Sequence, residues 1–254
     1  MTYILLANDD GVEAPGILAL ARAMNELADT VQAIAPATNQ SMSGHKINLF
    51  SDIRVEENRT LADGTPAVAV HGSPADCIAL ASHGLVKWPP RLVVSGINRG
   101  ANMGQDVFYS GTVSAAIESV IQGIPAVAVS LDNQAADNVE DYEVAARLAA
   151  RVVARLLEQD LPEFTVLNLN VPYGVDVKGI RLTRTGVRIY NDEIVRDGDI
   201  VQVVGDAPTG GGYSDERGAR VIAWAKAFLD ETFPLTGASH ADVTAYEITV
   251  EGLR

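Results

Sequence analysis

Short apolar runs that alternate with segments of helical periodicity are the feature that most limits how this chain can fold. The runs have the length and composition of strands buried on both faces of a sheet, and they span residues 3–7, 31–35, 91–95, 126–130 and 165–169. Between them, apolar side chains recur at three- and four-residue spacing in segments beginning at Pro15 and Pro74, across 113–121 and from about 140 to 158. The alternation predicts an α/β fold with a mostly parallel sheet and helices on both faces.

Two regions depart from this alternation. Residues 46–72 indicate short strands and turns, and residues 180–212 indicate an irregular antiparallel extension with Asp-Gly and Gly-Gly-Gly turns. A helix from about 214 to 229 and a last strand at 246–250 follow, and this strand could pack on the same domain or on another subunit. We therefore expect a core of residues 1–180 and a C-terminal extension of 181–254 that serves oligomerisation or is exchanged between subunits.

The charge balance excludes several classes of partner. The 254 residues include 33 acidic and 19 basic side chains, which gives a net charge of −14. Binding to nucleic acid or to an anionic membrane surface needs the opposite surplus. The single Cys77 rules out an intrachain disulfide framework, and no apolar run reaches the roughly 18 residues needed to span a bilayer. We expect a cytoplasmic, globular protein that binds neither nucleic acid nor membrane.

Polar groups cluster where the predicted strands end. Asp9 and Asp10 directly follow the first strand, and two adjacent carboxylates at a buried strand end favour binding of a divalent cation. The alternative is an acidic turn in which Gly11 supplies a positive φ. The segments 39–45 and 95–104 follow two further strands, and ligands of an open parallel sheet bind at this edge.

A predicted helix begins directly after Ser110, Gly111 and Thr112. Free N–H groups at a helix N-terminus bind anions, although capping alone would also explain a hydroxyl residue there. A cation site beside an anion-binding helix start favours phosphoester hydrolysis. The chain contains no P-loop, no G-x-S-x-G elbow and no H-E-x-x-H motif. Arg99 could reach a phosphate or form a salt bridge with a neighbouring acidic side chain.

Several motifs in this order resemble the SurE family of nucleotidases. They cover about two-thirds of the chain and are found at 3–11, 39–45, 72–77, 95–104, 110–116 and 168–172. The resemblance implies a Rossmann-like domain that binds one divalent metal ion, Mg²⁺ or Mn²⁺ with Ca²⁺ as an alternative. It also implies hydrolysis of 5′- and 3′-nucleoside monophosphates, activity on short polyphosphate in some members, and a homodimer or homotetramer.

The resemblance also assigns site residues, position by position. The implied metal ligands are Asp9, Asp10, Ser41 and Asn98, with Ser43 as the alternative to Ser41. The implied substrate-binding residues are Asn98, Asn102, Ser110, Gly111 and Thr112, and His45 joins them because it adjoins the ligand loop. We expect Asp10 to take part in proton transfer while Asp9 mainly holds the ion.

Two other functions stay open at this point. A haloacid-dehalogenase-type phosphatase would form an aspartyl-phosphate, but it expects Asp-x-Asp-Gly, and here the carboxylates are adjacent. A non-catalytic nucleotide sensor on the same fold would bind mononucleotides without releasing phosphate. The family pattern weakens in the last third of the chain, where Ser214 and Asp215 lead to the segment 225–235 in place of the strand that is usual in the family.

Overall fold

The computed structural model describes residues 1–48, 50–159, 161–174, 177, 179–183, 185–189, 192–197, 200–205, 209–212 and 247–252. The strands are β1 (Tyr3–Ala7), β2 (Thr30–Pro36), β3 (Val55–Thr60), β4 (Pro66–Val70), β5 (Leu92–Arg99), β6 (Ala126–Asp132), β7 (Thr165–Pro172), β8 (Arg181–Thr183), β9 (Gly186–Ile189), β10 (Asp192–Asp197), β11 (Ile200–Gly205), β12 (Thr209–Gly212) and β13 (Glu247–Gly252). The helices are α1 (Pro15–Asn25), α2 (Pro74–Leu80), α3 (Gly111–Ile121) and α4 (Glu143–Glu158), with short helical turns η1 (Ala81–Leu85), η2 (Gly104–Phe108) and η3 (Val139–Tyr142). None of these helices is both long and apolar enough to cross a membrane.

Nine of the described strands form one sheet in the order β3-β4-β2-β1-β5-β6-β7-β13-β8. Every pairing from β4 through β7 is parallel, whereas β3 runs antiparallel to β4 and β13 runs antiparallel to β7. The carboxyl ends of β1, β2, β5, β6 and β7 therefore meet at one edge of the sheet. The predicted α/β fold with a mostly parallel sheet is confirmed.

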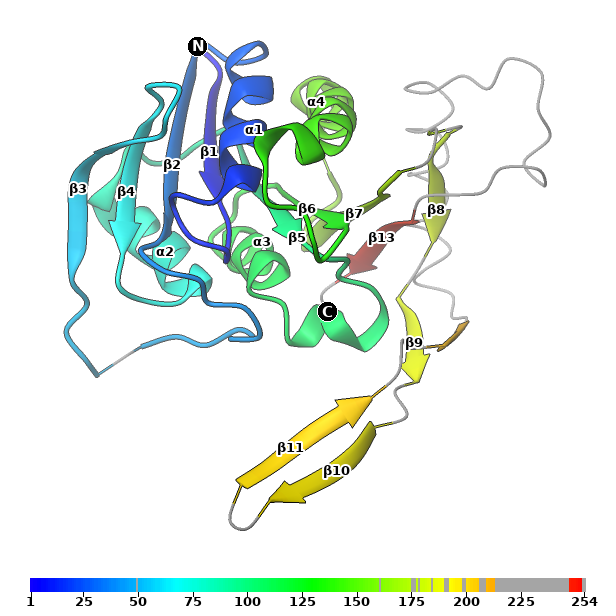
Figure 1. The fold of residues 1–254 in the computed structure, drawn as a ribbon. Helices are drawn as coiled ribbons and strands as arrows, with labels where there is room; N and C mark the ends of the chain where they lie inside the picture. Colours follow the sequence, from blue (N-terminus) through cyan, green and yellow to red (C-terminus); the bar gives the residue numbers. More distant parts are fainter. Residues whose placement is uncertain are drawn as a thin grey trace.

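Helices cover both faces of this sheet, and the strands supply apolar side chains to each (Figure 1). In β1, Ile4 and Leu6 join the core beneath α1 and α4, whereas Leu5 and Ala7 join the core beneath α2 and α3. A strand with both faces buried must be apolar at every position, which explains the continuous run from Tyr3 to Ala7.

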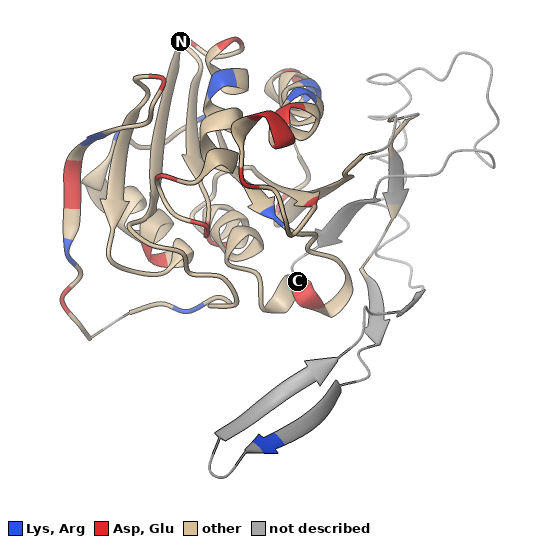
Figure 2. Cartoon of the chain, in the orientation of Figure 1, with Lys and Arg blue, Asp and Glu red and all other residues tan. Residues whose placement is uncertain are grey.

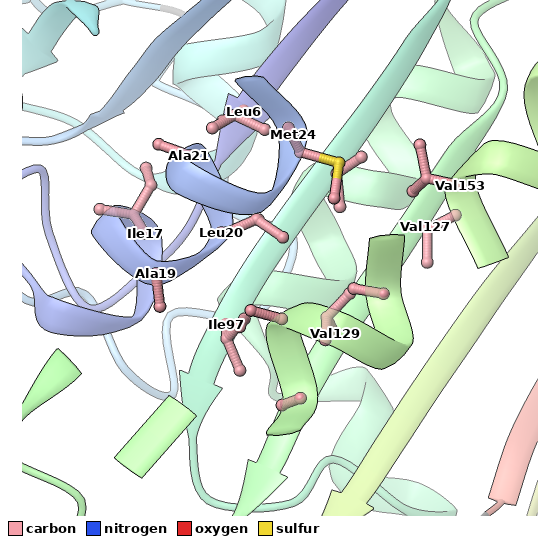
Figure 3. Close-up of a cluster of buried hydrophobic side chains, with 14 of the residues drawn as sticks. Leu6, Ile17, Ala19, Leu20, Ala21, Met24, Ile97, Val127, Val129 and Val153 are labelled. Atoms are coloured by element: carbon pink, nitrogen blue, oxygen red, sulfur yellow. The ribbon is translucent and has the colours of Figure 1, made fainter. Parts of the chain in front are cut away.

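The core beneath α1 shows how helical periodicity becomes packing (Figure 3). Ile17, Leu20, Ala21 and Met24 recur at three- and four-residue spacing, so they share one face of α1 and are fully buried. They pack in one cluster with side chains of β1, β5, β6 and α4. This contact holds α1 against the sheet, so the turn between β1 and α1 lies at the carboxyl end of β1.

Three elements differ from the sequence-based boundaries. β5 continues past the predicted end at residue 95 to Arg99, with an irregular register against β6 between Ser95 and Asn98. The helix predicted from Pro74 divides into α2 and the π-helical turn η1, where Gly84 has a φ of 99°. The long helix proper begins at Glu143, after the 3₁₀ turn η3.

The described part of the C-terminal region is built from antiparallel pairs. β10 and β11 form a hairpin that projects away from the large sheet, and β9 pairs with β12 (Figure 1). β13 lies between β7 and β8, so the last predicted strand packs on the sheet of the same chain. The helix predicted at about 214–229 lies outside the described residues.

Candidate metal and phosphate site

The two adjacent carboxylates lie at the carboxyl end of β1, where the chain turns toward α1. The side chain of Asn8 closes this turn, because its Nδ2 donates to the Gly11 carbonyl at 2.8 Å and its Oδ1 accepts from the Gly11 N–H at 3.2 Å. Gly11 has a φ of 109°, a value that favours glycine. The turn that the sequence offered as an alternative is therefore present, and it presents both carboxylates at the ligand-binding edge.

Asp9 is enclosed between β1 and the start of α3. It is 3% exposed, and the Thr112 hydroxyl donates a hydrogen bond to its Oδ1. A Cβ added at Gly111 would lie 2.7 Å from the Asp9 Cβ, so only glycine allows this approach of helix and carboxylate. Burial raises the pKa of Asp9 to about 6, the charge of Asp10 adds to the rise, and the hydrogen bonds from Thr112 oppose it.

Asp10 faces two other segments. Its Oδ1 accepts from Asn39 Nδ2 at 3.2 Å, and its Oδ2 accepts from the main-chain N–H of Arg99 at 2.9 Å. Burial also raises the pKa of Asp10, and the hydrogen bond from the Arg99 N–H is the largest opposing contribution. Asp10 thus joins the loop after β2 to the end of β5.

The loop that carries Ser41 is held close to both carboxylates. The Gln40 N–H donates to the Asp9 carbonyl at 2.7 Å, and the Ser41 N–H donates to Asn39 Oδ1 at 2.7 Å. Ser41 is exposed, whereas Ser43 Oγ is buried without a hydrogen-bond partner in the described part of the chain. Ser41 therefore lies exposed in a loop tied to the carboxylate pair.

The end of β5 and the loop that follows it bring two asparagines to the same edge. Asn98 is 9% exposed, and its Nδ2 donates to the Gly100 carbonyl at 2.7 Å, which leaves its amide oxygen as the atom able to bind a cation. Asn102 is also buried, and its Nδ2 donates to Ser130 Oγ at 2.8 Å. Much of the Asn102 amide is therefore used to anchor the loop to β6.

Two residues of β7 complete this anchor, and sequence reasoning gave them no role. Asn170 Oδ1 accepts from the Asn102 N–H at 2.8 Å, and the Asn102 carbonyl accepts from Asn168 Nδ2 at 2.8 Å and Asn170 Nδ2 at 3.1 Å. The sequence signal that could have identified them is the pair of amide side chains, Asn168 and Asn170, at alternate positions of a mostly apolar strand. They fix the backbone of the glycine-rich loop above the ends of β6 and β7.

Ser110 caps the N-terminus of α3, which is the alternative to anion binding that the sequence offered for this hydroxyl. Ser110 Oγ accepts from the Val113 N–H at 3.1 Å, so this hydroxyl satisfies the helix itself. Gly111 and Thr112 form the first turn, which packs against Asp9. The structure thus brings Ser110, Gly111 and Thr112 beside the carboxylate pair.

His45 and Arg99 each have an acidic partner. His45 Nε2 lies 2.8 Å from Oε2 of Glu118 on α3, and this contact is the main reason that the pKa of Glu118 is lowered. Arg99 Nη1 lies 2.9 Å from Asp137 Oδ1, which is the salt bridge that the sequence left open. The substrate contact expected of His45 stays a prediction.

The donor set fits a hard divalent cation. In the described residues, no three His, Cys, Asp or Glu side chains gather as a metal site, so a cation here would bind two carboxylates together with amide or hydroxyl oxygens. Asp9, Asp10 and Asn98 meet at one edge, with Ser41 in the adjoining loop. Oxygen ligands of this kind suit Mg²⁺, Mn²⁺ or Ca²⁺, and a cation would offset the repulsion between the carboxylates.

Comparison with known proteins gives one consistent family. The family model described as survival protein SurE matches residues 4–192, and the model of the malate synthase G alpha-beta insertion domain matches residues 213–254, of which the structure describes 247–252. The 5′-nucleotidase SurE of Herpetosiphon aurantiacus is 48% identical over 195 residues, covering 76% of this chain and 75% of that protein. The 5′-nucleotidase SurE of Rubrobacter xylanophilus is 40% identical over 233 residues, covering 87% and 86%. A crystal structure of the SurE protein from Aquifex aeolicus superposes with a TM-score of 0.72 at 31% identity, covering 98% of this chain and 93% of that one.

Proposed function

Because the chain belongs to the SurE family, we propose that it is a metal-dependent phosphomonoesterase that hydrolyses 5′- and 3′-nucleoside monophosphates to nucleoside and phosphate. Nucleotidase activity is supported by relatives that bear the name 5′-nucleotidase SurE at 40–48% identity. Hydrolysis of 3′-nucleotides and of short polyphosphate goes beyond that name. The observation that carries the proposal is the carboxylate pair at the end of β1, of which Asp9 is buried, with the first turn of α3 packed against Asp9.

One divalent ion, Mg²⁺ or Mn²⁺ with Ca²⁺ as a substitute, is the proposed cofactor. Asp9, Asp10, Ser41 and Asn98 would hold it. The raised pKa of each carboxyl supports this assignment, because an ionised pair at this site gains from a positive partner. When bound, the ion would polarise a phosphoryl oxygen and lower the pKa of a coordinated water.

The side chains and main-chain groups of the site would orient the phosphate, accept a proton and contact the substrate. The first turn of α3, formed by Ser110, Gly111 and Thr112, would orient the phosphate, since N–H groups and the helix dipole favour an anion there. Asp10 is less buried than Asp9, so it is the better candidate to take a proton, while Asp9 holds the ion. Substrate contacts from Asn98, Asn102 and His45 complete the proposal.

A phosphate-release assay tests this function. The purified protein should release phosphate from 5′-AMP and 3′-AMP, lose activity in excess EDTA, and regain it with added Mg²⁺ or Mn²⁺. Nucleotide binding without phosphate release would instead indicate a sensor. Trapping by beryllium fluoride on a carboxylate would indicate a haloacid-dehalogenase-type phosphatase. Full activity of Asp9→Asn at saturating metal would contradict the assignment of Asp9.

The assembly and location stay predictions. A homodimer or homotetramer is expected from the family resemblance, and light scattering at several protein concentrations would measure it. The small mononucleotide is the expected partner, and fractionation of the source cells would test the cytoplasmic location.

A further inference from the structure

A hollow of about 170 Å³ opens beside Asp10. Its walls come from the start of α1, the loop after β2, the end of β5 and the segment that leads into η3. These segments contribute Pro15, Asn39, Arg99 and Asp137, among others. The hollow therefore shares one carboxylate with the candidate metal site and continues away from it.

The hollow and the start of α3 lie on opposite sides of the carboxylate pair. α1 and α4 cover one face of the sheet, and α2 and α3 cover the other (Figure 1). Asp9 contacts α3, whereas both hydrogen-bond partners of the Asp10 carboxylate, Asn39 and Arg99, line the hollow. A phosphoester whose phosphate lay at α3 would thus have room for its leaving group across Asp10, in the hollow.

The walls suit a flat ring with polar edges. Ala14 and Pro15 are half-buried and supply small apolar surface, and the buried Ala136 and Tyr142 lie behind this wall. The Arg99 side chain is 42% exposed, so its planar guanidinium is accessible to a ligand while Asp137 holds it at 2.9 Å. Guanidinium planes stack on nucleobases and donate hydrogen bonds at their edges.

The size of the hollow limits what it can take. Pockets that enclose a whole drug-sized ligand have volumes of about 300–1,000 Å³. A volume of about 170 Å³ fits one part of a nucleoside rather than all of it. We propose that this hollow is the subsite for the nucleobase of the substrate, with Arg99 stacked on the base and Asp137 holding the guanidinium in place.

This inference rests on the proposed nucleotidase function, and it makes a separate prediction. AMP and ribose 5-phosphate share the phosphate and the sugar, but only AMP carries a base. The measured quantity is kcat/KM for AMP divided by kcat/KM for ribose 5-phosphate. Replacing Arg99 removes the stacking group but keeps the main-chain N–H that binds Asp10, so Arg99→Gln should lower this ratio about tenfold, mainly through the KM for AMP.

Two further variants sharpen the test. Arg99→Lys keeps the charge but loses the planar fork, so its ratio should stay low. Arg54→Gln is the matched control, because Arg54 forms an exposed ion pair with Glu56 on β3 at the far edge of the sheet. Its ratio should equal that of the wild type.

The outcomes separate this proposal from the function on which it rests. Phosphate release from AMP by the wild type establishes the function before any variant is compared. An unchanged ratio in Arg99→Gln, or a ratio restored in Arg99→Lys, would overturn the base subsite while the nucleotidase function stands. If the wild type releases no phosphate, calorimetric titration of AMP and ribose 5-phosphate into wild type and Arg99→Gln makes the same comparison by binding.

Discussion

The buried charge of Asp9 should destabilise the protein at neutral pH when no cation is bound. Burial raises the pKa of Asp9 from 3.8 to about 6. Below pH 3.8 the carboxyl is protonated in both the folded and the unfolded state. Between pH 3.8 and 6 the folded state retains the proton more strongly, so the stability that this carboxyl contributes is lost as pH rises through that window.

The size of the effect follows from the two pKa values. Each pKa unit corresponds to about 1.36 kcal/mol, so ionised Asp9 costs about 3 kcal/mol above pH 6. Asparagine has nearly the same shape, accepts from the Thr112 hydroxyl and does not ionise. Without a cation, Asp9→Asn should therefore be more stable than the wild type by about 1 kcal/mol at pH 4.5 and about 3 kcal/mol at pH 7.5.

Urea unfolding in the presence of EDTA, followed by circular dichroism at both pH values, measures this difference. Asp132→Asn is the control, because Asp132 is an exposed carboxylate at the end of β6 and its replacement should leave the free energy of unfolding within about 0.5 kcal/mol. Saturating Mg²⁺ or Mn²⁺ should stabilise the wild type and leave Asp9→Asn nearly unchanged. The reasoning would be refuted if the stability of Asp9→Asn relative to the wild type did not increase between pH 4.5 and 7.5. It would also be refuted if Asp9→Asn were less stable than the wild type.

Three other substitutions test the surroundings of the carboxylate pair. Gly111→Ala places a Cβ 2.7 Å from the Asp9 Cβ, so kcat for phosphate release should fall about 10- to 100-fold while the helical circular dichroism is retained. His45→Gln removes the 2.8 Å contact that ties the Ser41-bearing loop to α3, so the Mg²⁺ concentration for half-maximal activity should rise several-fold. The control His71→Gln breaks the 2.9 Å contact of His71 with Glu56 on β3 and should leave that concentration unchanged. Asn170→Leu leaves the buried main-chain N–H of Asn102 unpaired, which should lower the free energy of unfolding in urea by about 1–3 kcal/mol.

The fold and the position of the site follow from local sequence. A short continuous apolar run such as Tyr3–Ala7 favours a strand buried on both faces, and the spacing of Ile17, Leu20 and Met24 favours one buried helix face. The alternation of such elements favours parallel strands, whose carboxyl ends collect on one edge. The approximate site could therefore be placed before any side-chain contact was known.

Contacts between distant segments were beyond sequence reasoning. Asn170 hydrogen-bonds a main-chain group 68 residues earlier, and His45 pairs with Glu118, 73 residues later. No local pattern specifies such partners, because they depend on which loops the sheet brings together. The continuation of β5 to Arg99 was missed for a related reason, since Asn98 and Arg99 are polar yet still pair with β6.

The acidity of the whole chain also constrains how the site can work. At a net charge of −14, long-range electrostatics repel an anionic substrate. Lys and Arg are spread over α1, α4, several strands and the loops of the described structure (Figure 2). Arg99 already pairs with Asp137. Under the proposed function, a phosphate beside Asp9 and Asp10 would therefore depend on short-range positive potential from the proposed divalent ion and the first turn of α3. Such a site suits a small mononucleotide better than a long polyanion, whose further charges would meet the acidic surface without compensation.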